Sequence, residues 1–133
     1  MKFSKATNYA LHTMLFLVAE TSNRPVGVQY LAEKQGVSPA YLSKILTKLV
    51  KAGLIDSVSG ANGGYMLGAQ KKDVSFLDVI HAIEGRASLF NCCLDGETEC
   101  LIQKVMVSAE QAMEDKLKAQ KIVDLADQIT VRK

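Results

Sequence analysis

Apolar residues in the first part of the chain recur at helical spacing and predict three helices. The first, over residues 5–20, has apolar side chains around most of its circumference, as a helix buried on several sides does. A short helix over residues 28–35 follows, and Gly36 can end it. The third begins after the capping residue Ser38, with Pro39 at its first position, and runs to about residue 52. Its apolar residues lie at positions i, i+3, i+4, i+7 and i+8, which places them on one face: Leu42, Ile45, Leu46, Leu49 and Val50.

The pattern then changes to two short strands and returns to helix. Residues 54–58 and 65–67 are the predicted strands, and the Asn-Gly pair between them is typical of a hairpin. A helix over residues 75–84 and a long helix over residues 100–120 follow, with a weaker helical piece after them. The long helix carries an apolar stripe that so small a domain would not cover: Leu101, Ile102, Val105, Met106, Ala109 and Met113. The predicted fold class is therefore mainly α with a small β-hairpin wing, a winged helix-turn-helix followed by a long C-terminal dimerisation helix.

The second and third helices, joined by a tight turn, match the helix-turn-helix pattern. The third helix leaves a polar, basic face that can enter the major groove, with its N-terminal residues at base edges. Glycines in the hairpin let its main chain turn sharply and approach phosphates. Such helices can also serve only for packing, but the adjoining Gly-rich hairpin favours double-stranded DNA as the partner. The candidate DNA-binding residues are Ser38, Ala40, Tyr41, Ser43, Lys44, Lys48, Ser59, Gly60, Asn62, Gly63 and Gly64.

Composition narrows the class of protein. The chain of 133 residues has a formal net charge of only +2, so positive charge for DNA must be concentrated locally. Its apolar runs are far shorter than the ~20 residues that span a bilayer, and no secretory signal is visible. We therefore expect a cytoplasmic protein with no membrane partner. The chain shows no catalytic triad order and no phosphate-binding loop, so an enzyme is not expected.

Three cysteines, Cys92, Cys93 and Cys100, cluster in one segment. In a reducing compartment this clustering indicates redox chemistry or metal binding more than a structural disulfide. Three interpretations stay open: a thiol switch, an iron–sulfur cluster such as 2Fe-2S, or three inert cysteines under a loop. The further ligand of a cluster would be His12, or a carboxylate such as Glu97 or Glu99. Cys100 is the best candidate for a reactive thiolate, because it precedes a predicted helix whose dipole favours negative charge.

Residues 30–42, 49–55, 60–67 and 79–85 together resemble the Rrf2 family of bacterial transcription regulators. The resemblance implies a homodimer, with the long C-terminal helix crossing its partner, bound to a partly palindromic operator. Family wings often carry an arginine just before the first glycine, where this chain has Ser59. Cluster-binding members hold three cysteines five residues apart, and this chain departs from that spacing.

The sequence therefore predicts a DNA-binding domain over residues 1–85, a cysteine-containing sensor loop over 86–99, and a dimerisation helix with a C-terminal segment over 100–133. The predicted function is that of a sequence-specific transcriptional regulator that responds to redox, electrophile or nitric-oxide stress through its cysteine loop. We expect it to act as a repressor. The alternatives are an iron–sulfur-dependent regulator, and a regulator controlled by a partner protein in which the cysteines are structural.

Overall fold

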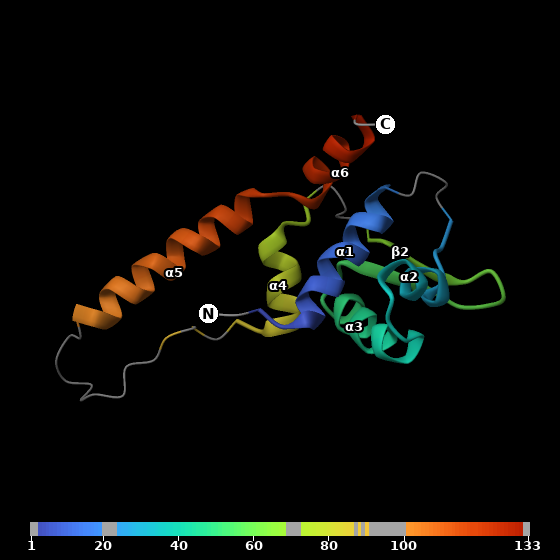
Figure 1. Ribbon diagram of the computed structural model, residues 1–133, viewed down its shortest axis with the longest axis horizontal. Coiled ribbons are helices and arrows are strands. Elements are labelled where there is room, and N and C mark those ends of the chain that lie inside the picture. The colour runs from blue at the N-terminus through green and yellow to red at the C-terminus, as the bar shows by residue number, and fades with distance from the viewer. Residues whose placement is uncertain are drawn as a thin grey trace.

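The computed structural model describes residues 3–19, 24–68, 73–86, 88, 90 and 101–131. Its elements follow the predicted order, with bounds within two residues of those expected. They are α1 (Lys5–Ala19), α2 (Val28–Gln35), α3 (Pro39–Lys51), β1 (Ile55–Val58), β2 (Gly64–Leu67), α4 (Phe76–Glu84), α5 (Leu101–Ala119) and α6 (Ile122–Val131). The expected fold class, mainly helical with one small antiparallel hairpin, is confirmed (Figure 1).

Helix α1 lies at the centre of the body, and the other elements except α5 surround it (Figure 1). It packs against α2, α3, α4, α6 and β2. The core is built from buried apolar side chains of all these helices and of β1, among them Ala10, Met14, Leu17, Leu31, Leu42, Leu46, Leu49, Ile55, Val79, Ile122 and Ala126. The apolar surface predicted around most of the first helix is therefore explained, because α1 is covered on several sides.

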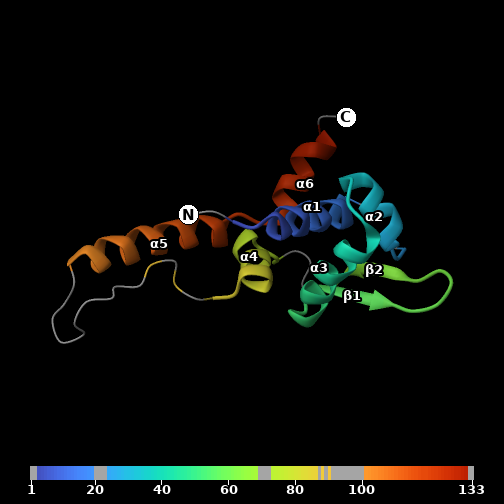
Figure 2. The ribbon, with the colours of Figure 1, turned by 60° about the horizontal axis from the view of Figure 1, so that its bottom comes forward.

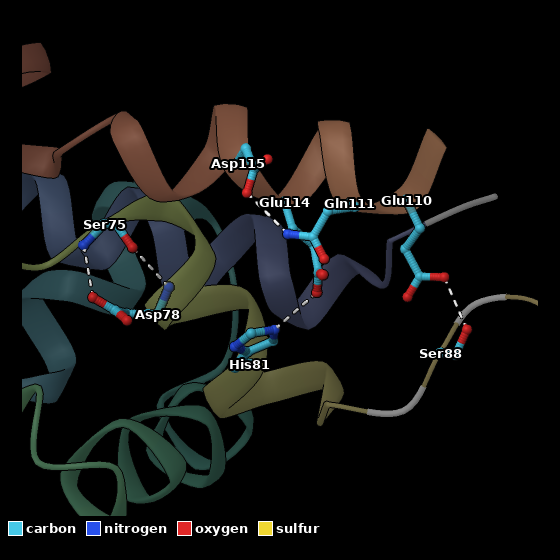
Figure 3. Close-up of polar contacts among 8 residues, drawn as sticks. All are labelled: Ser75, Asp78, His81, Ser88, Glu110, Gln111, Glu114 and Asp115. Atoms are coloured by element: carbon cyan, nitrogen blue, oxygen red, sulfur yellow. Dashed lines mark hydrogen bonds and ion pairs between the residues drawn. The ribbon is translucent and has the colours of Figure 1, made fainter. Parts of the chain in front are cut away.

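Side-chain caps set the starts of α3 and α4. The Ser38 hydroxyl accepts a hydrogen bond from the backbone N–H of Tyr41 at 3.1 Å, and Pro39 occupies the first turn. In α4 the Ser75 hydroxyl accepts from the N–H of Asp78, while the Asp78 carboxylate accepts from the N–H of Ser75, as Figure 3 shows. A helix N-cap of this kind is worth about 1 kcal/mol.

The hairpin has the predicted strands but a longer turn than the Asn-Gly pair suggested. Ile55 pairs with Leu67 and Val58 pairs with Gly64, so residues 59–63 form the connection. The N–H of Gly63 donates to the carbonyl oxygen of Gly60 at 3.0 Å, which closes a turn that begins at Gly60. The Asn-Gly pair therefore ends this turn and does not form a two-residue hairpin loop.

A backbone contact that the sequence did not predict ties the hairpin to the segment before α2. Val26 and Tyr65 exchange two hydrogen bonds, of 2.9 and 2.8 Å. The Val26 main chain passes so close to Gly64 that a β-carbon there would lie 2.5 Å from the Val26 carbonyl oxygen. Gly64 also has φ of 153°, a backbone conformation that other residues rarely adopt.

Helices α5 and α6 differ in burial. No residue of α5 is buried, and Leu101, Ile102 and Val105 are 71%, 66% and 68% exposed. Figure 1 shows α5 leaving the body as a long arm with its N-terminal end farthest from α1. The apolar stripe predicted from the sequence is thus helical and uncovered. Helix α6 instead returns to the body, where Ile122 and Ala126 pack in the core.

We expect Gly64→Ala to lower the free energy of unfolding by about 2 kcal/mol more than Gly60→Ala, as measured by urea denaturation. Both glycines have positive φ, so both substitutions strain the backbone. Only at Gly64 does the added methyl group also meet the Val26 backbone, since nothing lies within 4 Å of a β-carbon at Gly60. Equal losses for the two variants would contradict the packing role assigned to Gly64.

Candidate nucleic-acid interface

Helix α3 has one buried face and one exposed face, as its sequence pattern predicted. Leu42, Leu46 and Leu49 are fully buried against the core. The opposite face carries most of the predicted DNA-binding residues in exposed positions, namely Ser38, Ala40, Tyr41, Lys44 and Lys48, while Ser43 is half-buried. Figure 2 shows the β1–β2 hairpin projecting from the body beyond α3, so that a helix and a wing extend from one body.

An aromatic contact from α1 positions the predicted base-reading residue Tyr41. The rings of Tyr9 and Tyr41 meet edge to face, with their centroids 5.9 Å apart and their planes at 88°. Tyr41 keeps 40% of its surface exposed, so it is supported on one side and accessible on the other. An edge-to-face contact of this kind restricts the rotation of the Tyr41 ring. Tyr9 was not among the predicted site residues, because nothing local in the sequence links it to Tyr41.

The predicted wing residues divide into an exposed tip and a packed base. Ser59, Gly60 and Asn62 are exposed at the tip, where a nucleic-acid backbone could approach them. Gly63 and Gly64 are half-buried, and a β-carbon at Gly63 would overlap the Val58 carbonyl oxygen. The two glycines at the base are therefore needed to build the wing.

The electrostatics of α3 involve one carboxylate from α4. Exposed lysines lie along the helix at Lys44, Lys48 and Lys51. Glu84 is the last residue of α4, and its carboxylate feels the charge of Lys48. A hydrogen bond from the Thr7 side chain, then one from the Ser4 backbone, and a smaller effect of the Lys48 charge together hold the pKa of Glu84 below its ordinary value.

Of the predicted sensor residues, only His12 falls in the described part of the chain. Cys92, Cys93 and Cys100 lie outside the described residues. His12 is exposed on α1, and its Nδ1 lies 2.9 Å from the carbonyl oxygen of Asn8. It borders a cavity of about 260 Å³ whose walls are mainly apolar and come from α1, α4 and α6. Among the residues that the structure describes, no three His, Cys, Asp or Glu side chains gather as a metal site.

Polar contacts connect α5 to α4 and to the segment after it (Figure 3). His81 Nε2 lies 3.5 Å from a carboxylate oxygen of Glu114, which is an ion pair when the imidazole is protonated. The Ser88 hydroxyl donates to Glu110 at 2.9 Å. The arm is thus held to the body through exposed or half-exposed polar groups.

Within the described ranges, no helix is long and apolar enough to cross a membrane.

Comparison with known proteins agrees with this geometry. Residues 3–128 match the Rrf2 family, described as iron-dependent transcriptional regulators. Protein rrf2 of Nitratidesulfovibrio vulgaris is 32% identical over 130 residues, which cover 94% of this chain and 87% of that protein. The structure of CymR, the global cysteine regulator of B. subtilis, superposes with a TM-score of 0.83 at 26% identity, over 96% of this chain and 98% of that one.

A second solved structure, the oxidized form of Staphylococcus aureus CymR, has a TM-score of 0.76 at 31% identity, over 95% of this chain and 96% of that one. The family match and these relatives cover nearly the whole chain, including the winged helix-turn-helix and the long α5 arm. The resemblance noted from the sequence is confirmed, and an enzyme is excluded as the family consists of regulators. The chain belongs to the Rrf2 family of bacterial transcriptional regulators.

Proposed function

We propose that this regulator is a cytoplasmic homodimeric repressor that binds a partly palindromic DNA operator and responds to redox, electrophile or nitric-oxide stress through its cysteine loop. The observation that carries the proposal is the pairing of an exposed basic face on α3 with a projecting wing, beside an uncovered apolar arm. The first two features suit duplex DNA, and the third suits a second copy of the chain. The division into residues 1–85, 86–99 and 100–133 belongs to the same proposal.

In the proposed complex α3 enters the major groove with its N-terminal end at the base edges. Tyr41, supported by Tyr9, then lies near that end. Lys48 lies about two helical turns further along, where it can contact phosphates. Phosphate contacts fix the position of the protein, and base contacts discriminate between sequences. The wing tip carries Ser59 where many family members have arginine. This position therefore places no positive charge in a narrow minor groove.

The proposed dimer contact is the apolar stripe of α5. Leu101, Ile102 and Val105 are more than 60% exposed in the single chain. Burying apolar surface gains roughly 25 cal/mol per Å², so a helix of this kind gains most by crossing the same helix of a partner. A two-fold axis through this contact places two recognition helices about 34 Å apart, one turn of DNA.

In the proposed sensing mechanism, chemical modification of Cys92, Cys93 or Cys100 changes the orientation of α5 relative to α4. A thiolate attacks a peroxide oxygen, which leaves a sulfenic acid and hydroxide. A second thiol then attacks the sulfenic sulfur, which gives a disulfide and releases water. Cys93 and Cys100 are a better pair for this than adjacent Cys92 and Cys93, since a vicinal disulfide strains the backbone. The solved oxidized form of a CymR relative supports a redox response. The polar contacts His81–Glu114 and Ser88–Glu110 are those that a moving α5 would break.

A second candidate is an iron–sulfur-dependent regulator, which the iron-dependent description of the family favours. One observation on this chain fits it. Because His12 Nδ1 contacts the Asn8 carbonyl oxygen, Nε2 remains as a ligand atom, and histidine ligands commonly bind a backbone carbonyl through their other nitrogen. The cysteines would supply the thiolate ligands, as in iron–sulfur proteins generally.

For DNA recognition we expect Lys48→Ala to weaken binding to operator and random duplexes alike. It should also reduce the slope of the logarithm of the binding constant against the logarithm of salt concentration by about one. Tyr41→Ala should instead reduce the ratio between operator and random affinity. Both are measured by fluorescence anisotropy at several salt concentrations. Lys118→Ala, an exposed lysine on α5, is the control and should leave both quantities unchanged. Equal losses on both DNAs for Tyr41→Ala would show that the reading face is misplaced.

For assembly we expect Val105→Asp to convert the dimer to monomers and to weaken operator binding at least ~10-fold, since a buried unpaired charge opposes the contact. Sedimentation velocity at micromolar concentration measures the first effect. Gln111→Glu adds the same charge at an exposed position on another side of α5 and should remain dimeric. A wild-type protein that sediments as a monomer would overturn the proposal.

For sensing we expect Cys100→Ser to abolish the change in operator affinity after peroxide, a quinone electrophile or nitric oxide. Cys93→Ser should be next in severity and Cys92→Ser mildest, because Cys93 and Cys100 form the favoured pair. The measurement is operator affinity before and after each reagent. If the triple Cys→Ser protein responds as wild type does, the cysteines are structural and a partner protein carries the signal. Stoichiometric iron and sulfide in anaerobically purified protein would favour the cluster.

A further inference from the structure

Two residues of α1, Tyr9 and Thr13, connect the end of α2 to the beginning of α3. Gln35 is the last residue of α2, and its Nε2 donates to Thr13 Oγ1 at 2.8 Å. The Thr13 hydroxyl donates in turn to the Tyr9 carbonyl oxygen, also at 2.8 Å. The Tyr9 ring then meets the ring of Tyr41, which belongs to the first turn of α3. We call Gln35, Thr13 and Tyr9 the brace.

The brace spans the turn of the helix-turn-helix from the side of α1. This turn consists of residues 36–38, between the last residue of α2 and the first residue of α3. Tyr9 and Thr13 are four residues apart, which is about 6 Å along the axis of α1. One of them therefore holds the chain before the turn, and the other contacts a side chain just after it. The brace adds side-chain contacts to the main-chain hydrogen bond from Val37 to Ala32, which also holds the turn.

The hydrogen bond at the centre of the brace is buried and contributes direction more than stability. Thr13 is 0% exposed, so water does not compete for its hydroxyl group. Gln35 Oε1 is buried as well, and it has no hydrogen-bond partner among the described residues. A buried acceptor without a partner lowers stability, which offsets the stabilisation from the hydrogen bond of Nε2. The amide of Gln35 therefore fixes the end of α2 against α1 with little net gain in stability.

We propose that the brace positions the Tyr41 ring and thereby determines how well the protein discriminates between operator and random DNA. A ring that is held in place before binding loses less conformational freedom when it meets a base edge. The three residues of the brace touch no DNA in this scheme and act through Tyr41. The inference rests on the proposed base-reading role of Tyr41, and it adds positioning residues from two other helices.

The first test is Gln35→Met, which removes the hydrogen bond to Thr13 together with the unpaired Oε1. We expect the midpoint of urea denaturation to change little, whereas the ratio of operator to random affinity should fall about 2- to 5-fold. A purely structural role predicts instead that a variant of unchanged stability keeps the wild-type ratio. Gln111→Met is the control, because it removes a hydrogen bond of 2.9 Å to Asp115 on α5 and should leave the ratio unchanged.

The second test is a double-mutant cycle between Tyr9 and Tyr41, with the same affinity ratio as the readout. Tyr9→Leu removes the ring contact and should lower the ratio about 2- to 10-fold, with little change in the affinity for random DNA. In the Tyr41→Ala background, the same substitution should lower the ratio no further, because the ring that it positions is gone. Tyr9→Phe keeps the ring and should stay within about 2-fold of wild type. Phe16→Leu removes another half-buried ring of α1 and should keep the wild-type ratio.

The outcomes distinguish the brace from the proposed function. Thr13→Val replaces Tyr9→Leu in the cycle if circular dichroism shows that Tyr9→Leu does not fold. Wild-type protein that binds no duplex DNA, or a Tyr41→Ala protein with an unchanged ratio, would overturn the proposed role of α3. If Tyr41→Ala lowers the ratio, an unchanged ratio in either Gln35→Met or the Tyr9 variant overturns the brace proposal alone. Equal losses on operator and random DNA in these variants would do the same.

Discussion

The burial of α1 is the constraint on which the rest of the body depends. Ala10 and Met14 are wholly buried and Leu17 nearly so, and α2, α3, α4, α6 and β2 all pack against this one helix. Protein interiors are close-packed, so a shift of α1 is passed to whatever lies against it. Because α3 rests on this core through its leucines, the direction of its exposed basic face follows from α1. The same helix supplies Tyr9 to the contact with Tyr41, and so touches the exposed face of α3 directly.

The contacts that hold α5 to the body, and the end of α4 to the start of α1, are polar, whereas the core of the body is apolar. His81–Glu114 and Ser88–Glu110 hold the α5 arm, and Glu84 holds the end of α4 to the start of α1. Exposed polar contacts of this kind are worth little individually and are screened by salt, so they can break without unfolding the core. Contacts of this kind suit the proposed sensing mechanism, in which α5 changes its orientation relative to α4 while the core stays folded.

The arm itself has no core of its own in a single chain. Its large apolar side chains are exposed from Leu101 to Val107, while α6, directly after it, is anchored in the body by Ile122 and Ala126. The arm is therefore fixed at its C-terminal end and uncovered at its N-terminal end. This arrangement suits the proposed dimer, in which a second copy of the chain covers the arm.

The sequence by itself determined the helices, the two strands and the exposed polar face of α3, because helical periodicity, capping residues and glycine stops act over a few neighbouring residues. Ser38 and Gly36 were identified in this way and lie where they were expected. The predicted roles of Cys92, Cys93 and Cys100 remain predictions, as these residues lie outside the described part of the chain. Only the tertiary structure decided that Val26 pairs with Tyr65, that Tyr9 supports Tyr41, that α6 returns to α1, and that Glu84 meets Ser4 and Thr7. Each of these contacts joins residues far apart in the chain, and their pairing depends on how whole elements pack, for which no local pattern of polar and apolar residues carries a signal.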